Sequence, residues 1–298
     1  MDKIFASRLI RKKFLFTIAV LICLLLLIRY CILPIDLISV KSNDNIGSFI
    51  DKFVASVFTA VVVGYFLFWM QSEEKKKELE FTESGYEIEK YLSKTRITTG
   101  NWLFNGGLGR YTKFATIPLL SAQASKDRRT IAIKIIVINP FNIELLQKYI
   151  DFRVSVEKNK KKKNWTQSEV QSEILATIIT AFHYKKVNQF LDISVNVKDF
   201  FTLSRMDISD TVAVITREDP AIPSIIANKD SYMYMHYSEE FQQVLRQSKN
   251  VDYTFSSIQI PSKDEIRTCI KSLYPEQIFS EELLKEVYNK FKEPKSPF

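Results

Sequence analysis

The sequence predicts a membrane protein with an α/β domain: an N-terminal two-helix transmembrane hairpin, then a cytoplasmic α/β domain whose mixed sheet is flanked by helices. Two long apolar runs, 14–33 and 53–70, predict the hairpin. At ~1.5 Å per residue, each run is long enough to cross the ~30 Å hydrocarbon core of a bilayer. Strand-like and helical segments alternate after the hairpin, which is typical of an α/β layer. We therefore divide the chain into a hairpin (1–71), a helical connector (72–98) and an α/β domain (99–298).

The flanks of the two apolar runs predict their orientation. Basic side chains cluster before the first run, at 11–13, and after the second run, at 75–77, whereas the short connection also carries acidic residues. Because Lys and Arg are enriched in cytoplasmic flanks, we expect both termini in the cytoplasm. A cleaved signal peptide is the alternative for the first run. That run is long for a signal segment, however, and no small-x-small cleavage motif follows before Pro34.

Small residues recur at four-residue spacing in the second apolar run, at Ser56, Ala60 and Gly64. Such a stripe lets helix backbones approach closely and favours helix association. Two interpretations remain open: association between copies of the chain, or packing on the first helix of the same chain.

Strand and helix signals can be placed along the α/β domain. The run IAIKIIVI at 131–138 is nearly continuous and β-branched, as in a strand buried on both faces. A short strand at 102–104 precedes it, and the strand–helix–strand–helix order predicts a parallel, right-handed layer. The remaining expected elements are helices at 110–125 (broken or kinked at Pro118), 142–156 and 168–186, strands at 190–197 and 211–216, half-buried strand tyrosines at Tyr232, Tyr234 and Tyr237, and helices at 238–248, 264–272 and 281–291.

Composition narrows the class of protein. The 298 residues contain 42 Lys and Arg against 34 Asp and Glu, a net charge of +8, which fits contact with anionic lipid or nucleic acid, or a solvated surface. The three cysteines form no CxxC pair, so a disulfide framework and a thiolate zinc site are not expected. We predict no cofactor and no metal site.

A glycine cluster after the first predicted strand is the sharpest local feature. Three of the seven glycines of the chain fall within four residues, in the sequence GGLGR. Backbone N–H groups of such a loop can face an anion at a helix N-terminus. The alternative is a tight strand-to-helix turn without a ligand, because the pattern matches neither GxGxxG nor a Walker A loop. The candidate ligand- or partner-binding residues are Gly106, Gly107, Gly109, Arg110, Lys113 and Asn139.

One local motif invites an enzymatic interpretation. His183-Tyr184-Lys185 resembles the HxK motif of phospholipase D-like enzymes, which also need an Asp five residues past the Lys and a second HxK. Here Phe190 occupies the Asp position, and His236 is not followed by x-Lys. Because phosphoryl transfer of that kind needs both a nucleophile and a general acid, we predict no catalytic residues and no enzyme activity. A membrane-anchored phosphodiesterase built on His183, Lys185 and His236 is the alternative.

A family resemblance rests on stretches covering about two-thirds of the chain. WLFNGGLGRYTKFATIPLLS and IKIIVINPFNIELLQKYIDFR lie between Trp102 and Arg153, and ISDTVAVITREDPAIPSIIA and YMYMHYSEEFQQVL follow later. These stretches resemble the two-transmembrane effectors of bacterial anti-phage, retron-type defence systems. The resemblance implies a degenerate phospholipase D-like fold for the cytoplasmic domain.

The resemblance also implies a function. It predicts a dormant toxin of an abortive-infection system, held inactive by a retron reverse transcriptase with its RNA–DNA hybrid. Once released, this effector would act as a homo-oligomer on membrane lipid and disrupt the bacterial inner membrane. A variant of this hypothesis has the effector gated by a cyclic oligonucleotide at the glycine-rich loop.

Overall fold

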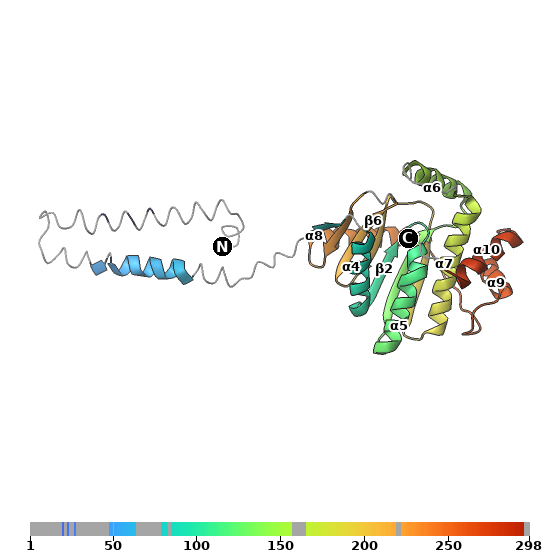
Figure 1. Cartoon of the computed structure of the whole chain (residues 1–298), viewed down its shortest axis with the longest axis horizontal. Helices are drawn as coiled ribbons and strands as arrows, with labels where there is room; N and C mark the ends of the chain where they lie inside the picture. Colours follow the sequence, from blue (N-terminus) through green and yellow to red (C-terminus); the bar gives the residue numbers. More distant parts are fainter. Residues whose placement is uncertain are drawn as a thin grey trace, which may run out of the picture. The chain divides into compact units, whose positions relative to one another are not determined.

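The computed structural model describes residues 20, 23, 27, 48–49, 51–63, 79–82, 85–156, 165–218 and 222–294 (Figure 1). The chain divides into two compact units, Met1–Glu74 and Lys75–Phe298. The first unit contributes few described residues, among them a helical stretch over 51–63. The second unit holds the α/β layer.

The predicted transmembrane hairpin is contradicted. Within the described residues, no helix combines the length and the apolar character needed to cross a membrane. The predicted inner-membrane location with both termini in the cytoplasm rested on the two spans and is contradicted with them. Most of 14–33, and 64–70 of the second run, lie outside the described residues.

The small-residue stripe falls partly within the described helical stretch. Ser56 and Ala60 lie on it and are exposed, whereas Gly64 lies outside the described residues. The association of helices through this stripe stays a prediction.

An eight-stranded mixed sheet forms the centre of the second unit. Strands β2, β3 and β4 pair in parallel, and every other pairing is antiparallel. The strand predicted at 131–138 is confirmed as β3, which lies between its two parallel neighbours. In sheet order the strands are β1 (Leu79–Thr82), β7 (Ser224–Asn228), β6 (Val212–Arg217), β5 (Ser204–Ser209), β2 (Asn101–Asn105), β3 (Ile131–Ile138), β4 (Leu191–Lys198) and β8 (Lys249–Val251).

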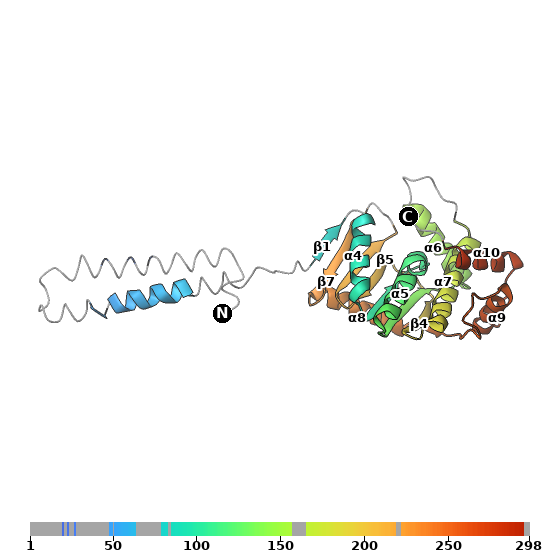
Figure 2. The ribbon, with the colours of Figure 1, turned by 60° about the horizontal axis from the view of Figure 1, so that its bottom comes forward.

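Helices cover the two faces of the sheet unequally. Figure 1 shows α4 (Gly85–Thr98), α5 (Ile117–Asp127) and α7 (Gln167–Val187) across one face, and Figure 2 shows α8 (Tyr232–Arg246) on the other side. The helix α8 contacts β5, β6 and β7. Three further helices pack on or near α7 rather than directly on the sheet: α6 (Ile143–Val156), α9 (Lys263–Leu273) and α10 (Glu281–Lys292).

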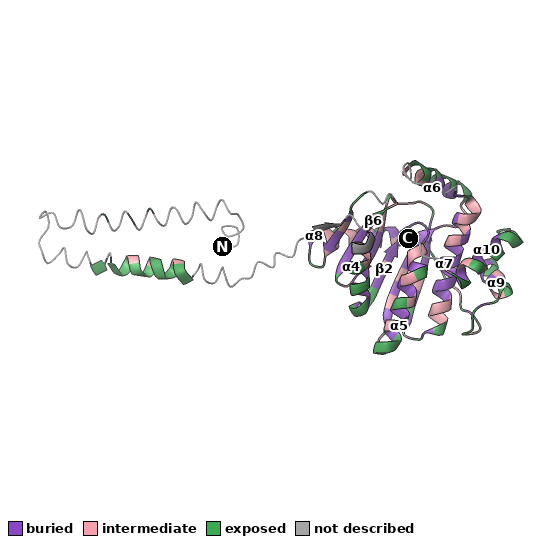
Figure 3. Ribbon diagram, viewed as in Figure 1, coloured by how far each residue is buried: buried purple, intermediate pink, exposed green. Residues whose placement is uncertain are grey.

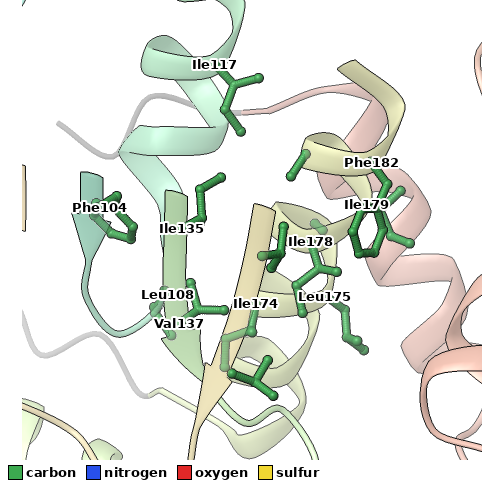
Figure 4. Close-up of a cluster of buried hydrophobic side chains, with 14 of the residues drawn as sticks. Phe104, Leu108, Ile117, Ile135, Val137, Ile174, Leu175, Ile178, Ile179 and Phe182 are labelled. Atoms are coloured by element: carbon green, nitrogen blue, oxygen red, sulfur yellow. The ribbon is translucent and has the colours of Figure 1, made fainter. Parts of the chain in front are cut away.

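The larger hydrophobic core lies between the sheet and α7. Alternate residues of β3 and β4, such as Ile133, Ile135 and Val195, point into it, and most of α7 is buried against them (Figure 3). Figure 4 shows Leu108 and Ile117 in the same cluster as the α7 side chains Ile174 to Phe182. A smaller core on the opposite face contains Ile136, Met206 and Phe241 under α8. The sheet therefore separates two cores.

Two local predictions are wrong, and a third is met by an irregular helix. The connector is not helical throughout, because Leu79–Thr82 is strand β1, paired with β7. The helix expected over 110–125, broken or kinked at Pro118, is present, with a π-helical turn, η2 (Thr112–Thr116), immediately before α5, in which Pro118 is the second residue. The three tyrosines of Tyr232–Arg246 lie on helix α8, which begins six residues before the predicted start because Ser231 caps it.

Candidate functional site

The carboxyl ends of β2, β3 and β4 meet at one edge of the sheet, because these strands are parallel. Backbone hydrogen bonds join the segments that follow them. The N–H of Gly106 donates to the Ile136 carbonyl (3.0 Å), and the N–H of Asn139 donates to the Lys198 carbonyl (2.9 Å). The predicted glycine loop and Asn139 therefore share this edge. Open α/β sheets bind ligands at such an edge.

The three loop glycines lie in close packing. A Cβ on Gly106 would come 2.6 Å from the Phe104 ring, and one on Gly107 would come 2.5 Å from the Tyr149 hydroxyl oxygen. Gly109 has a φ of +69°, and a Cβ there would come 2.6 Å from Cγ2 of Thr177. Geometry alone therefore explains these glycines as a strand-to-helix turn pressed against neighbouring side chains.

The two cations expected beside the loop face a carboxylate of the protein. The Lys113 Nζ lies 2.8 Å from Oε2 of Glu173, and the Arg110 Nε lies 3.9 Å from Oε1 of the same side chain. Burial lowers the pKa of Lys113, and the nearby Glu173 opposes that shift. Arg110 also lies over the Trp165 ring, 5.5 Å from its centroid. Anion binding by this loop stays a prediction, but the protein already supplies these cations with a partner.

Asn139 is engaged in a local network. Its Nδ2 donates to Oδ1 of Asp199 (2.9 Å), and its Oδ1 accepts from the N–H of Phe141 (3.0 Å). Asn142 Nδ2 donates to the same Asp199 oxygen (3.0 Å). Asn139 therefore ties the end of β3 to the segment after β4.

A buried lysine at the same edge was not predicted from the sequence. Lys198, the last residue of β4, is 1% exposed and lies on the sheet face opposite α7. Its Nζ donates to Oδ1 of Asn105 (2.5 Å) and to Oγ1 of Thr202 (3.3 Å). Among the described residues, no carboxylate lies within ion-pair distance of this amine. Nδ2 of Asn105, which is fully buried, has no hydrogen-bond partner in the described chain.

Burial lowers the pKa of Lys198 to about 7, and the charge of Glu240 only partly opposes the shift. The amine thus titrates near neutral pH, because a charged ammonium is costly beside neutral groups. Two neighbouring donor side chains, Lys198 and Asn105, therefore lack an anionic partner among the described residues. One sequence signal could have revealed this: Asn196 and Lys198 alternate with Val195 and Val197 at the end of the strand expected over 190–197.

The residues of the enzymatic alternative do not form one site. His183 lies on α7, with its ring edge-on to Phe291 at 5.5 Å, and Lys185 forms an ion pair with Asp252 (2.8 Å). His236 lies on α8, exposed, on the other side of the sheet. The two histidines therefore belong to opposite faces.

Metal-ligating groups do not cluster in the part of the chain that the structure describes. Cys269 is buried in α9, where burial raises the pKa of its thiol. This cysteine is a core side chain, which is a common fate of an isolated cysteine.

No protein-family model matches the chain, and no curated protein matches it. Among solved structures, the chain is similar to the archaeal chromatin protein TrmBL2, described as showing a novel mode of DNA binding. The two chains are 11% identical, with a TM-score of 0.37, over 69% of this chain and 68% of that one. A likeness at this level carries no argument about function.

Proposed function

We propose that residues 75–298 are a sensing unit without catalysis in an anti-phage effector, and that this unit binds a negatively charged group of its partner at Lys198 and Asn105. The partner is the one that the family resemblance implies, a reverse transcriptase with its RNA–DNA hybrid, whose phosphates supply the negative charge. Membrane disruption is not part of this proposal, because no described helix is long and apolar enough to cross a membrane.

One observation carries the proposal: the buried Lys198 amine has only neutral hydrogen-bond partners, next to an unpaired amide of Asn105. Burying an ammonium without a counter-charge lowers stability, so such a residue needs a compensating role. An anionic group placed between the two donors would pair with both. Lysine is a common partner of phosphate groups in proteins.

The side chains around the amine suit binding rather than catalysis. The described hydrogen-bond partners of Lys198 are an amide and a hydroxyl, Asn105 and Thr202. Neither is a nucleophile paired with a general base, as covalent phosphoryl transfer requires. The net charge of +8 additionally favours association with a polyanion.

Hybrid binding by charge-removing variants tests this function. Lys198→Met should weaken binding of a labelled RNA–DNA hybrid to the full chain by roughly tenfold to hundredfold, because a hydrogen bond to a charged group contributes ~1.5–3 kcal/mol. Fluorescence anisotropy at fixed salt measures the dissociation constant. Lys134→Met is the matched control, because Lys134 lies on the same sheet face at a partly exposed position of β3 and should change binding less than about threefold.

Equal affinities of the wild-type chain and Lys198→Met would remove Lys198 from the site. Equal losses in Lys198→Met and Lys134→Met would instead indicate nonspecific attraction to the basic surface. A response to cyclic oligonucleotides that depends on Arg110 and Lys113, but not on Lys198, would favour the glycine-loop alternative.

A further inference from the structure

The connection between β4 and β5 covers the Lys198 site. This connection, residues 199–203, is named the cover loop here. From its inner side, Oγ1 of Thr202 accepts from the Lys198 Nζ at 3.3 Å, and the Phe200 ring centroid lies 5.5 Å from the same nitrogen. Lys198 is 1% exposed and Asn105 is 0% exposed. A ligand can therefore reach the two donors only if covering atoms move.

The outer contacts of the cover loop run to the segment after β3 and to α6. Oδ1 of Asp199 accepts from the Nδ2 of Asn139 (2.9 Å) and of Asn142 (3.0 Å). The Phe201 ring lies 5.7 Å from the ring of Tyr149 and 5.5 Å from that of Phe152. These side-chain contacts hold the loop together with the packing of Phe201 against the larger core and of Phe200 against the smaller one. Opening them separates no strand pairing of β4 or β5.

Leu203, the last residue of the cover loop, differs from Asp199 and Phe201 in its contacts. Leu203 is 54% exposed and takes part in none of these contacts. Asp199 and Phe201, which hold the loop through their contacts, are called the latch residues. Leu203 serves as the control position in the same loop. Segments held by a few side-chain contacts open at lower free energy than the sheet beneath them.

We propose that the cover loop is a gate over the anion site: in its closed position it is latched to Asn139, Asn142 and α6, and its opening exposes Lys198 and Asn105 to a ligand. This inference rests on the proposed function, because it concerns access to the same site. A partner that engages α6 or the Asn139 segment would release the latches and so control uptake of the anion. Differential affinity for the open loop is what makes such control possible.

Amine labelling of the full chain without ligand tests the gate. The protein is treated with acetic anhydride, and acetylation rates of individual lysines are followed by peptide mass spectrometry. In the folded wild-type chain, Lys198 should react at least tenfold more slowly than the same lysine in the chain unfolded in guanidinium chloride, because the folded amine is 1% exposed. Asp199→Ala and Phe201→Ala should each accelerate labelling of Lys198 at least fivefold, and Leu203→Ala should leave it unchanged.

Lys113 separates gate opening from unfolding. It is 3% exposed and is buried on the α7 side, so it reacts only when that core opens. Acceleration at Lys198 with unchanged labelling of Lys113 supports the gate. Parallel acceleration of both lysines, no acceleration in either latch variant, or fast labelling of Lys198 in the wild-type chain would each overturn it. Because no ligand is present, these outcomes are independent of hybrid binding, whose loss in Lys198→Met tests the proposed function separately.

Discussion

At the scale of single residues, Lys198 costs stability where it stands. Its amine is buried among an amide, a hydroxyl and an aromatic ring, and burial lowers its pKa to about 7. A side chain of similar length without the charge would fit this position at a lower cost. Residues that weaken a fold in this way are found at functional sites.

The lowered pKa of Lys198 predicts how stability depends on pH. Because the folded-state pKa lies below the unfolded value of 10.5, the unfolded chain binds more protons between about pH 7 and pH 10.5, and stability rises with pH across this window. Lys198→Met should therefore raise the free energy of unfolding by ~1–3 kcal/mol at pH 6, and the gain should shrink towards pH 10. Urea unfolding of both proteins at several pH values measures this. A gain that does not vary with pH would contradict the buried, titrating amine.

Gly109 is the loop glycine whose backbone requires glycine. Its φ of +69° is strained for other residues, and a Cβ would also meet Thr177 at 2.6 Å. Gly109→Ala should lower the free energy of unfolding by about 1–3 kcal/mol. Gly100→Ala is the control, because its Cβ would meet only side-chain ends, at 3.3 Å from Arg129 and Asp210, and should cost less than about 1 kcal/mol. Chemical denaturation compares them, and equal losses would refute the argument from backbone geometry.

At the scale of elements, Glu173 joins α7 to η2 and α10. It lies on α7 and pairs with Lys113 of η2, whose side chain is 3% exposed. Lys290 of α10 approaches the same carboxylate at 3.6 Å. One carboxylate therefore pairs with lysines from two segments, η2 and α10, which accounts for Lys113 beside the glycine loop.

Removing this carboxylate should be costly unless the buried lysine is removed too. Glu173→Leu leaves the Lys113 ammonium buried without its partner and should destabilise the protein by about 3–5 kcal/mol. The double variant Lys113→Met/Glu173→Leu should recover most of that loss, because no buried charge remains. Thermal and urea unfolding of the single and double variants form the measurement. A double variant as unstable as Glu173→Leu alone would argue that the carboxylate acts through other contacts.

Among the antiparallel strands that were not predicted, β5 and β7 illustrate two different reasons. The sequence of β5, SRMDIS, is too polar to predict a buried strand. Its Asp207 is nevertheless buried, and Oδ1 of Asp207 accepts a hydrogen bond from the Trp102 indole N–H at 3.2 Å. β7 directly follows Pro223, and proline is more typical of turns than of strands. Proline is compatible with the start of a strand. Both segments are strands because each pairs with β6 in the sheet.

At the scale of the whole molecule, the two units predict independent folding of the second. Both hydrophobic cores lie within Lys75–Phe298. A fragment beginning at Lys75 should unfold cooperatively, with a melting temperature within about 3 °C of the corresponding transition of the full chain. Differential scanning calorimetry of both proteins tests this. Loss of the cooperative transition in the fragment would mean that the first unit contributes to the core.

The predicted transmembrane hairpin is contradicted, although the length of the two apolar runs supported it. Apolar run length is a property of the sequence alone, and both runs met the length for a span. Within the described residues, no helix has the required length and apolar character. Most of 14–33, and residues 64–70 of the second run, lie outside the described residues.

The sequence by itself determined the α/β character of the second unit, the bounds of β3, and the position of the glycine turn. These features depend on local periodicity, β-branched runs and backbone freedom, which neighbouring residues specify. Only the tertiary structure decided which charges have partners. Glu173 meets Lys113 across 60 residues of sequence, and Lys198 meets Asn105 across 93. Contacts at such separations are set by sheet order and helix packing. The sequence therefore pointed to Arg110 and Lys113 as candidate binding residues, whereas the proposed site is at Lys198, which belongs to no sequence motif.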